Sequence, residues 1–279
     1  MREQIRSKLS ALLGDKTPLH GYQGKAVPAP HLDSLSDEQL EELNAILRWN
    51  CFTVDTKGRR FGRRASQNKR ATPQVIPDER IIKLNQLLDL TDKTFLEIGC
   101  FEGVHTIGLG LFSPDVTAVD GRIENVVKTL VRSGFYGIRP RVFACDVDNL
   151  PLDPMLPVVD VIFHCGVLYH LKDPVRHLKE LLSRARCGIL LDTHYAMPEE
   201  LTQSYEVDGK KYGYKTFEEN DRKNVFAGLY DHAKWLSLDA LLNLLRQEGL
   251  TQIHETQTRN ERNGARVMII ASRGSTNTH

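Results

Sequence analysis

The sequence predicts an α/β protein built on a doubly wound, mostly parallel sheet. From Phe95 to about Asp192, short apolar runs alternate with amphipathic helical stretches, which is typical of parallel strands joined by crossover helices. The first apolar run ends in a turn with two glycines, Gly99 and Gly103, directly ahead of a helix. At 279 residues, with 41% hydrophobic and 26% charged residues, the chain is large enough to bury the core of one elaborated domain.

The region before the sheet, residues 1–76, is interpreted as a helical and basic N-terminal extension. Ser36 and Gln39 have the spacing of a capping box and open a helix that runs to Leu47. Seven cations without an intervening acid then follow between Lys57 and Arg70: Lys57, Arg59, Arg60, Arg63, Arg64, Lys69 and Arg70. An amphipathic helix over residues 78–90 leads into the main domain, which is expected over residues 77–279.

Within the main domain, each element follows from its own pattern. We expect strands at 94–98, 116–119, 141–144, 158–164 and 188–192, and helices at 103–111, 123–132 and 174–185. The rhythm breaks after Asp192, and residues 195–236 form a stretch too long for a plain loop. We interpret it as an insertion on the substrate side. A helix at 238–248 and two late strands near 252–256 and 267–272 complete the domain.

The turn after the first strand carries two carboxylates, Glu97 and Glu102. A dinucleotide-binding turn needs G-x-G-x-x-G, but Phe101 occupies the middle glycine position, which predicts a wider turn. Two carboxylates would also repel a diphosphate at the helix N-terminus, which disfavours an NAD-dependent enzyme. They favour a cationic ligand. S-adenosylmethionine carries an ammonium and a sulfonium and no phosphate.

Acidic residues also follow the next two strands. Ligands of doubly wound sheets lie beyond the carboxyl ends of the strands. Asp120, after the second strand, is suited to accept both hydroxyls of a ribose. Asp146, after the third, is a side-chain acceptor that, beside a free backbone N–H, can read the amino group and a ring nitrogen of adenine. The alternative for each acid is a solvated strand end.

These residues carry a resemblance to a known family. Four motifs together resemble the class I S-adenosylmethionine-dependent methyltransferases: Glu97-x-Gly99-x-x-x-Gly103, Val119-Asp120, Cys145-Asp146 and the block Gly166–Leu171. That block, Gly-Val-Leu-Tyr-His-Leu, and the Asp173-Pro174 that follows it are similar to the group around the tRNA wobble-uridine 5-oxyacetate methyltransferases. The resemblance covers about residues 77–185. It implies a Rossmann-like sheet of seven strands with the last one antiparallel.

The resemblance also implies a place for each part of the cofactor. Glu97, Gly99 and Gly103 would line its methionine end. Asp120 would lie on the ribose, and Asp146 with Val147 at the adenine. Gly166 and Leu168 would form the floor under the transferred methyl group.

Three side chains are candidates for catalysis. A general base is needed when the acceptor is a neutral hydroxyl or a protonated amine. His170 follows the fourth strand and His194 the fifth, and His194 is the better candidate because the insertion begins there. Tyr169 could contact the cofactor or close the acceptor pocket. For all three, simple packing is the alternative.

The predicted reaction is methyl transfer to an O or N atom of a small polar metabolite. We expect the N-terminal extension and the insertion to enclose this acceptor, with Arg222, Tyr230 and Trp235 contributing to the pocket. The alternative acceptor is tRNA at a wobble uridine, which the Gly166–Leu171 block and the Lys57–Arg70 cations favour and the net charge of +1 disfavours. In that group the donor can be a carboxylated cofactor, which needs further cations near the methyl position. The sequence identifies none, so ordinary S-adenosylmethionine is predicted.

Other classes of protein and of site are weighed by composition. A non-catalytic S-adenosylmethionine-binding protein is the alternative from another class. The five cysteines form no C-x-x-C pair, which predicts free thiols and no metal site. Since no apolar run approaches the length of a membrane span, we expect a cytoplasmic protein without a membrane partner.

Overall fold

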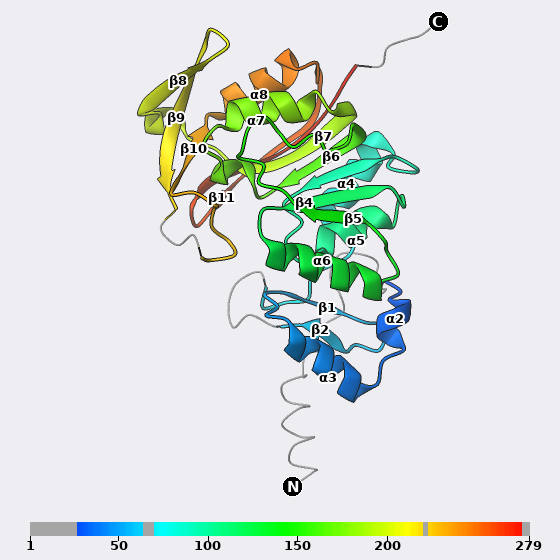
Figure 1. Cartoon of the computed structure of the whole chain (residues 1–279). Coiled ribbons are helices and arrows are strands. Elements are labelled where there is room, and N and C mark those ends of the chain that lie inside the picture. Colours follow the sequence, from blue (N-terminus) through cyan, green and yellow to red (C-terminus); the bar gives the residue numbers. More distant parts are fainter. Residues whose placement is uncertain (1–26, 64–69, 220–222, 275–279) are drawn as a thin grey trace, which may run out of the picture.

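The N-terminal extension forms a small unit of helices and a hairpin in the computed structural model, which describes residues 27–63, 70–219 and 223–274 (Figure 1). Its elements are α2 (Pro30–Asp33), α3 (Asp37–Ile46), β1 (Phe52–Val54) and β2 (Arg60–Gly62). The capping box is confirmed, since the Ser36 hydroxyl accepts from the Gln39 N–H and the Gln39 side chain accepts from the Ser36 N–H. The antiparallel β1–β2 hairpin is an addition to the helical extension predicted.

A sheet of seven strands forms the middle layer of the main domain. Its order is β11-β12-β7-β6-β3-β4-β5, where β3 is Phe95–Ile98, β4 Val116–Asp120, β5 Arg141–Ala144, β6 Val159–Cys165, β7 Ala185–His194, β11 Gln252–Glu261 and β12 Gly264–Ser272. The strands from β7 to β5 are parallel, and β12 is antiparallel to both of its neighbours. This confirms the predicted doubly wound, mostly parallel sheet with an antiparallel last strand.

Helices cover both faces of this sheet (Figure 1). They are α4 (Glu79–Leu88), α5 (Val104–Gly110), α6 (Ile123–Phe135), α7 (Pro174–Leu182) and α8 (Leu238–Gln247), with short 3₁₀ turns η1 (Leu168–His170) and η2 (Pro198–Glu200). Side chains of a strand alternate between faces, so Leu191 packs with α7 and α8 while Leu190 packs with α4 and α5. Both apolar layers are closed to water.

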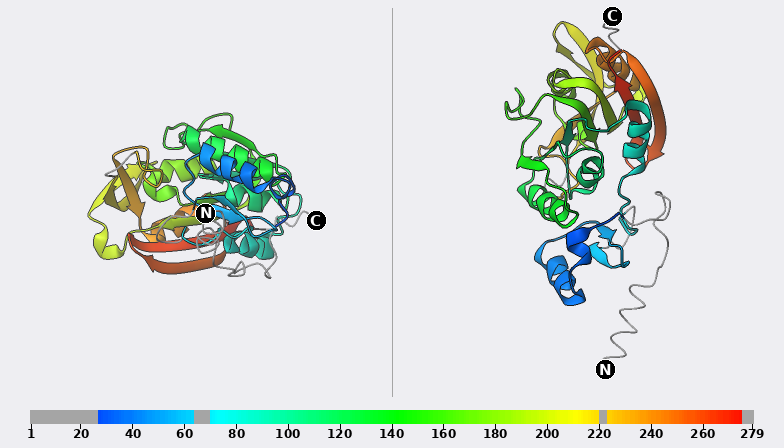
Figure 2. Two further views of the ribbon diagram at one scale, coloured as in Figure 1. Left: turned by 90° about the horizontal axis from the view of Figure 1, so that it is seen from below. Right: turned by 90° about the vertical axis from the view of Figure 1, so that its right-hand side faces the viewer.

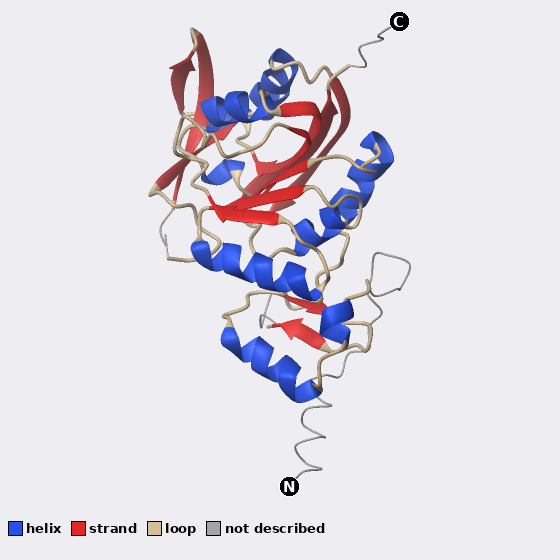
Figure 3. Cartoon of the chain, turned by 45° about the vertical axis from the view of Figure 1, so that its right-hand side comes forward, coloured by secondary structure: helices blue, strands red, loops and turns tan. Residues whose placement is uncertain are grey.

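The N-terminal unit packs against α6 (Figure 3). One hydrophobic cluster contains Leu32, Trp49 and Phe61 of the extension together with Ile107 and Tyr136 of the main domain. The predicted boundary between residues 76 and 77 separates the two parts in the sequence, but in the fold they share one hydrophobic core.

The insertion holds a three-stranded antiparallel sheet of its own. Strands β8 (Gln203–Val207), β9 (Lys210–Glu218) and β10 (His232–Leu236) lie in the order β10-β9-β8. The β8–β9 hairpin and the N-terminal unit lie toward opposite ends of the molecule (Figure 2). The hairpin therefore lies away from the N-terminal unit, and the enclosure of an acceptor by the extension and the insertion together stays a prediction. In the described residues, Arg70 and Phe226 connect the extension with the insertion.

All five cysteines are free thiols, as predicted. Among the described helices, none is long and apolar enough to cross a membrane.

Candidate cofactor and acceptor site

The turn after β3 depends on left-handed backbone at three positions. Gly99 and Gly103 have φ of +80° and +81°, which side chains rarely adopt. A Cβ at Gly99 would also lie 2.3 Å from Cγ2 of Val167. Phe101 is left-handed as well, at +50°, and its N–H donates to Oδ2 of Asp120 over 3.0 Å. This bond between the turn and the end of β4 holds Phe101 where a glycine usually stands.

Glu97 is fully buried at the end of β3. Its Oε2 accepts from the Thr106 hydroxyl over 2.5 Å, whereas its Oε1 has no hydrogen-bond partner within the described residues. The nearest basic group is Nδ1 of His105, 3.8 Å from Oε1. Burial raises the pKa of Glu97 to about 8. A buried carboxyl oxygen without a donor costs free energy, and it suits a ligand that brings a cation or an N–H group.

Glu102 is buried in ion pairs with two cations of α6, so the expectation that it contributes to a site for a cationic ligand was wrong. It is buried against α6 and the N-terminal unit, with Nζ of Lys128 at 3.0 Å and Nη2 of Arg132 at 3.6 Å. It also accepts from the backbone N–H groups of Asn50 and Cys51. Burial raises its pKa, but the two cations outweigh burial and hold it below the ordinary value. The Glu102 carboxylate therefore links the N-terminal extension to the main domain.

Asp120 and Asp146 lie on the same edge of the sheet as Glu97, because β3, β4 and β5 are adjacent and parallel. Asp120 accepts from the N–H groups of Phe101 and Arg122. Asp146 accepts the Asp148 N–H on Oδ1 over 3.0 Å and the Tyr230 hydroxyl on Oδ2 over 2.7 Å. The three predicted carboxylates therefore lie at the carboxyl ends of three neighbouring strands.

The residues beside Asp146 and after β6 are set into the core. The Val147 carbonyl accepts from Nδ1 of His177 over 2.9 Å, and burial lowers the pKa of His177 to about 4, so the imidazole is neutral. Gly166 has a φ of +79°. Leu168, expected under the methyl group, is buried within the main core.

Aromatic rings surround His194 at the end of β7. Its ring stacks on Trp235 with centroids 4.8 Å apart and meets Tyr169 edge-on at 4.7 Å. The Trp235 Nε1–H donates to the Tyr169 carbonyl over 2.8 Å, which ties β10 to η1. Nδ1 of His194 bonds the Ala265 carbonyl over 3.1 Å. Because a carbonyl only accepts, Nδ1 carries the proton and Nε2 is left as the basic nitrogen. Burial lowers the pKa of His194, so the ring is neutral near pH 7.

The other predicted residues are divided between several places. Nδ1 of His170 contacts the Glu219 carboxylate directly after β9. Tyr230 lies at Asp146, while Trp235 is buried beside His194. Arg222 lies outside the described residues.

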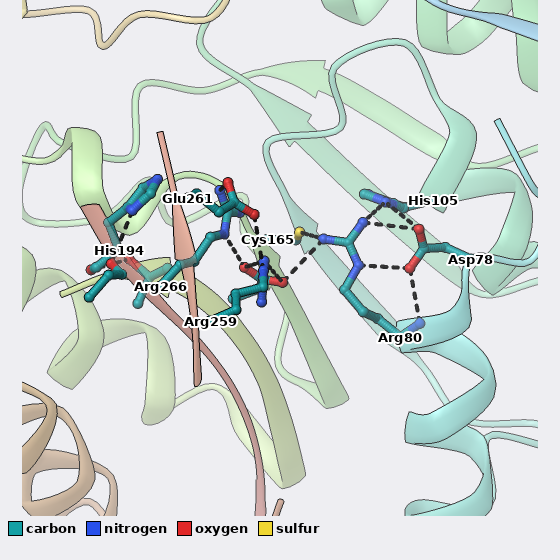
Figure 4. Close-up of polar contacts among 11 residues, drawn as sticks. Asp78, Arg80, His105, Cys165, His194, Arg259, Glu261 and Arg266 are labelled. Atoms are coloured by element: carbon teal, nitrogen blue, oxygen red, sulfur yellow. Dashed lines mark hydrogen bonds and ion pairs between the residues drawn. The ribbon is translucent and has the colours of Figure 1, made fainter. Parts of the chain in front are cut away.

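A charged network next to Tyr169 was missed by the sequence reasoning. Buried Asp192, on β7, accepts from Nε of Arg266 at 2.5 Å and from Arg259 at 2.9 Å, and Arg80 lies at 3.3 Å. Arg80 approaches from one side and the other two arginines from the opposite side (Figure 4). The Arg266 guanidinium carbon is also 5.2 Å from the Tyr169 ring centroid. These residues are far apart in sequence, and only the strand-end position of Asp192 could have signalled the site.

Nη2 of Arg266 would lie 3.7 Å from a Cβ placed on Gly166, so a cation does lie close to the predicted methyl position.

The cations between Lys57 and Arg70 have different roles. Arg59 pairs with Asp55 at 2.7 Å and with Asp37 at 3.1 Å, and it also donates to two backbone carbonyls, which makes it part of the fold. Lys57 Nζ donates to the Asp33 carbonyl. Arg63 is exposed. Arg64 and Lys69 lie outside the described residues.

Arg70 stacks its guanidinium on two rings, 5.3 Å from the centroid of Phe101 and 4.0 Å from that of Phe226.

No protein-family model matches the chain. Among curated proteins it is similar to enzymes named tRNA U34 carboxymethyltransferase. The protein from Marinobacter nauticus is 32% identical over 111 residues, which are 38% of this chain and 33% of that protein. The one from Shewanella loihica is 28% identical over 201 residues, which are 65% and 53%. The chain therefore spans a third to about half of these relatives.

The fold is also found in solved structures. The N-terminal domain of EvdMO1, crystallised with SAH and D-fucose, has a TM-score of 0.63 at 22% identity over 85% of this chain and 94% of that domain. An S-adenosylmethionine-dependent methyltransferase from Clostridium acetobutylicum has a TM-score of 0.50 at 17% identity over 71% and 90%. The chain thus has the Rossmann-like fold of the class I S-adenosylmethionine-dependent methyltransferases, and the resemblance seen in the sequence is confirmed.

Proposed function

We propose that this protein is an S-adenosylmethionine-dependent methyltransferase. The observation that carries the proposal is the buried Oε1 of Glu97, which has no hydrogen-bond partner among the residues that the structure describes and lies at the strand end where the cationic methionine portion would bind. Asp120 and Asp146 follow on the two neighbouring strands, where a ribose and an adenine would need acceptors. The left-handed Gly99, Gly103 and Gly166 leave backbone, without side chains, beside these carboxylates.

When bound, S-adenosylmethionine supplies an electrophilic methyl group on its sulfonium. The protein's part is to orient the acceptor, which can contribute about 7–11 kcal/mol to lowering the barrier. His194 would take the proton of an acceptor hydroxyl or amine on Nε2, because Nδ1 is committed to Ala265. A positioned base of this kind contributes about 10²–10⁴-fold. Tyr169 and Trp235 would hold the imidazole in place, and His170 would be oriented by Glu219.

For the acceptor, we propose tRNA. This is supported by the names of the relatives and by the cations near the extension, of which Arg63 is exposed. A small polar acceptor is the second candidate. It is supported by the aromatic walls around His194 and by the likeness of nearly the whole chain to a domain crystallised with D-fucose.

Calorimetry with S-adenosylhomocysteine and with NAD tests the cofactor: binding of NAD alone would refute the proposal. Binding of tRNA at increasing salt tests the acceptor. Arg63→Glu with Arg64→Glu should weaken tRNA binding and flatten its salt dependence, whereas Arg246→Glu, on α8, is the matched control. Arg59 is left intact because it holds the fold. If no salt-dependent tRNA binding exists, the tRNA acceptor fails.

The transferred group is open to a direct test. Arg266 beside Tyr169 is a cation of the kind that a carboxylated donor would need, although Asp192 already pairs with it. Mass spectrometry of the modified acceptor separates a methyl from a carboxymethyl product. Tight cofactor binding without turnover on any acceptor would instead indicate a non-catalytic binding protein.

A further inference from the structure

The segment Phe226–Tyr230, which we call the strap, crosses the carboxyl edge of the central sheet. At one end, the Phe226 ring lies 5.4 Å from that of Phe101, in the turn after β3. At the other end, the Tyr230 hydroxyl donates to Asp146, after β5. Four adjacent strands, β6-β3-β4-β5, present their carboxyl ends along this edge. This is where ligands of doubly wound sheets bind.

The middle of the strap contacts residues that follow β4 and β6. Nη2 of Arg122, two residues after β4, donates to the carbonyls of Ala227 at 3.0 Å and Gly228 at 3.3 Å. Leu229 packs closely on Gly121: a Cβ placed on Gly121 would lie 2.5 Å from Cδ1 of Leu229. A Cβ on Gly228 would lie 3.1 Å from the His170 carbonyl. The strap therefore contacts residues that follow all four strands.

The Tyr230 hydroxyl already donates to the Asp146 carboxylate, which is the acceptor that the adenine amino group would need. Asp146 has two carboxylate oxygens; Oδ1 accepts the Asp148 N–H and Oδ2 accepts the Tyr230 hydroxyl. An adenine amino group is also a donor, so it competes with the Tyr230 hydroxyl for Oδ2. The Tyr230 ring is held independently by Lys172, whose Nζ lies 3.2 Å from the ring centroid. Removing the hydroxyl alone should therefore leave the ring in place.

We propose that Tyr230 is a positioning residue of the cofactor site: its hydroxyl holds the strap on Asp146 in the cofactor-free protein and yields this carboxylate to the adenine when the cofactor binds. This inference rests on the proposed function and reassigns Tyr230 from the acceptor pocket to the adenosine end of the cofactor. Gly228 lies so near the His170 carbonyl and the Glu219 carboxylate that a Cβ on it would be 3.1 and 3.2 Å from their oxygens, so release of the strap would reach the pair beside the predicted acceptor. Cofactor binding would thereby prepare that side.

The test is the affinity for S-adenosylhomocysteine of Tyr230→Phe, measured by calorimetry. A hydrogen bond to a charged group contributes enough that its removal as a competitor should tighten binding about tenfold. Tyr214→Phe is the matched control, because the Tyr214 hydroxyl donates to Gln203 between β9 and β8 of the insertion. The affinity of this variant for S-adenosylhomocysteine should equal that of the wild type. Hydrogen exchange of the peptide spanning the strap gives a second readout: S-adenosylhomocysteine should accelerate it in the wild type, and Tyr230→Phe should show faster exchange before any ligand is added.

Different results would overturn the strap proposal and the proposed function. If the wild type binds S-adenosylhomocysteine but Tyr230→Phe binds it equally or more weakly, Tyr230 is not a competitor and the strap proposal is overturned. Slower strap exchange on binding in the wild type would overturn it too. If the wild type does not bind S-adenosylhomocysteine at all, the proposed function itself fails.

Discussion

Replacing Glu102 by alanine should weaken the attachment of the N-terminal unit to the main domain and so lower the free energy of unfolding. The side chains of Glu102, Lys128 and Arg132 are all fully buried, with separations of 3.0 and 3.6 Å between the carboxylate and the two cations. Removing one partner of such a group costs about 3–5 kcal/mol, because the remaining charges stay buried without compensation. Lys128 keeps Glu124 at 2.8 Å, and Arg132 keeps the Cys51 carbonyl at 3.1 Å. We therefore expect the lower end, about 3 kcal/mol.

Urea unfolding followed by tryptophan fluorescence measures this loss. The chain has two tryptophans, so Trp235→Phe leaves Trp49 as the probe, and all variants are compared in that background. Trp49 is well placed, since the Arg132 guanidinium lies 4.5 Å from its ring. Glu124→Ala is the matched control, because this partner of Lys128 is 48% exposed and should cost no more than about 1 kcal/mol. Equal losses for Glu102→Ala and Glu124→Ala would refute the idea that Glu102 joins the two parts.

Three further outcomes are expected. Gly99→Ala should lower the free energy of unfolding by about 1–3 kcal/mol, because its φ is +80° and its Cβ would lie 2.3 Å from Val167; wild-type stability in a thermal melt would contradict this. Burial raises the pKa of Glu97 to about 8 from 4.5, so stability that is fully present below pH 4.5 should be lost as the pH rises toward 8, by up to about 1.4 kcal/mol per unit. Glu97→Gln should flatten that pH profile of urea unfolding, and parallel profiles would count against it. His194→Gln should slow turnover about 10²–10⁴-fold while the affinity for S-adenosylhomocysteine changes little; unchanged turnover would remove His194 as the base.

The sequence predicted the parts of the fold that depend on local pattern. The strand at 141–144 coincides with β5, and helix α3 of the extension begins at its predicted cap, Ser36. Strand β7 extends beyond the predicted 188–192 to His194, because its pairing with β12 continues to Arg266 and His194, whereas its pairing with β6 ends at Asp192.

Partners distant in the sequence could not be predicted. Glu102 looked like a ligand residue because nothing local shows that Lys128 and Arg132 will be buried against it. The bond between Tyr230 and Asp146 spans 84 positions and depends on how the insertion folds back. By contrast, Asp120 and Asp146 were predictable as neighbours, since parallel strands bring their carboxyl ends to one edge whatever the loops do.

Phe101 makes the nucleotide turn dependent on chain that lies outside it. A glycine there would need no support, but the phenyl ring contacts Phe226 of the insertion in a tilted arrangement and Arg70 of the extension. A minimal domain cut at Pro77 would lose Arg70 and would expose Ile107 and Tyr136 to water. Transplanting the glycine motif alone into another scaffold would likewise leave the ring without its neighbours. The proposed recognition of a nucleoside would therefore depend on three segments of the chain, and we do not expect a shortened chain to keep it.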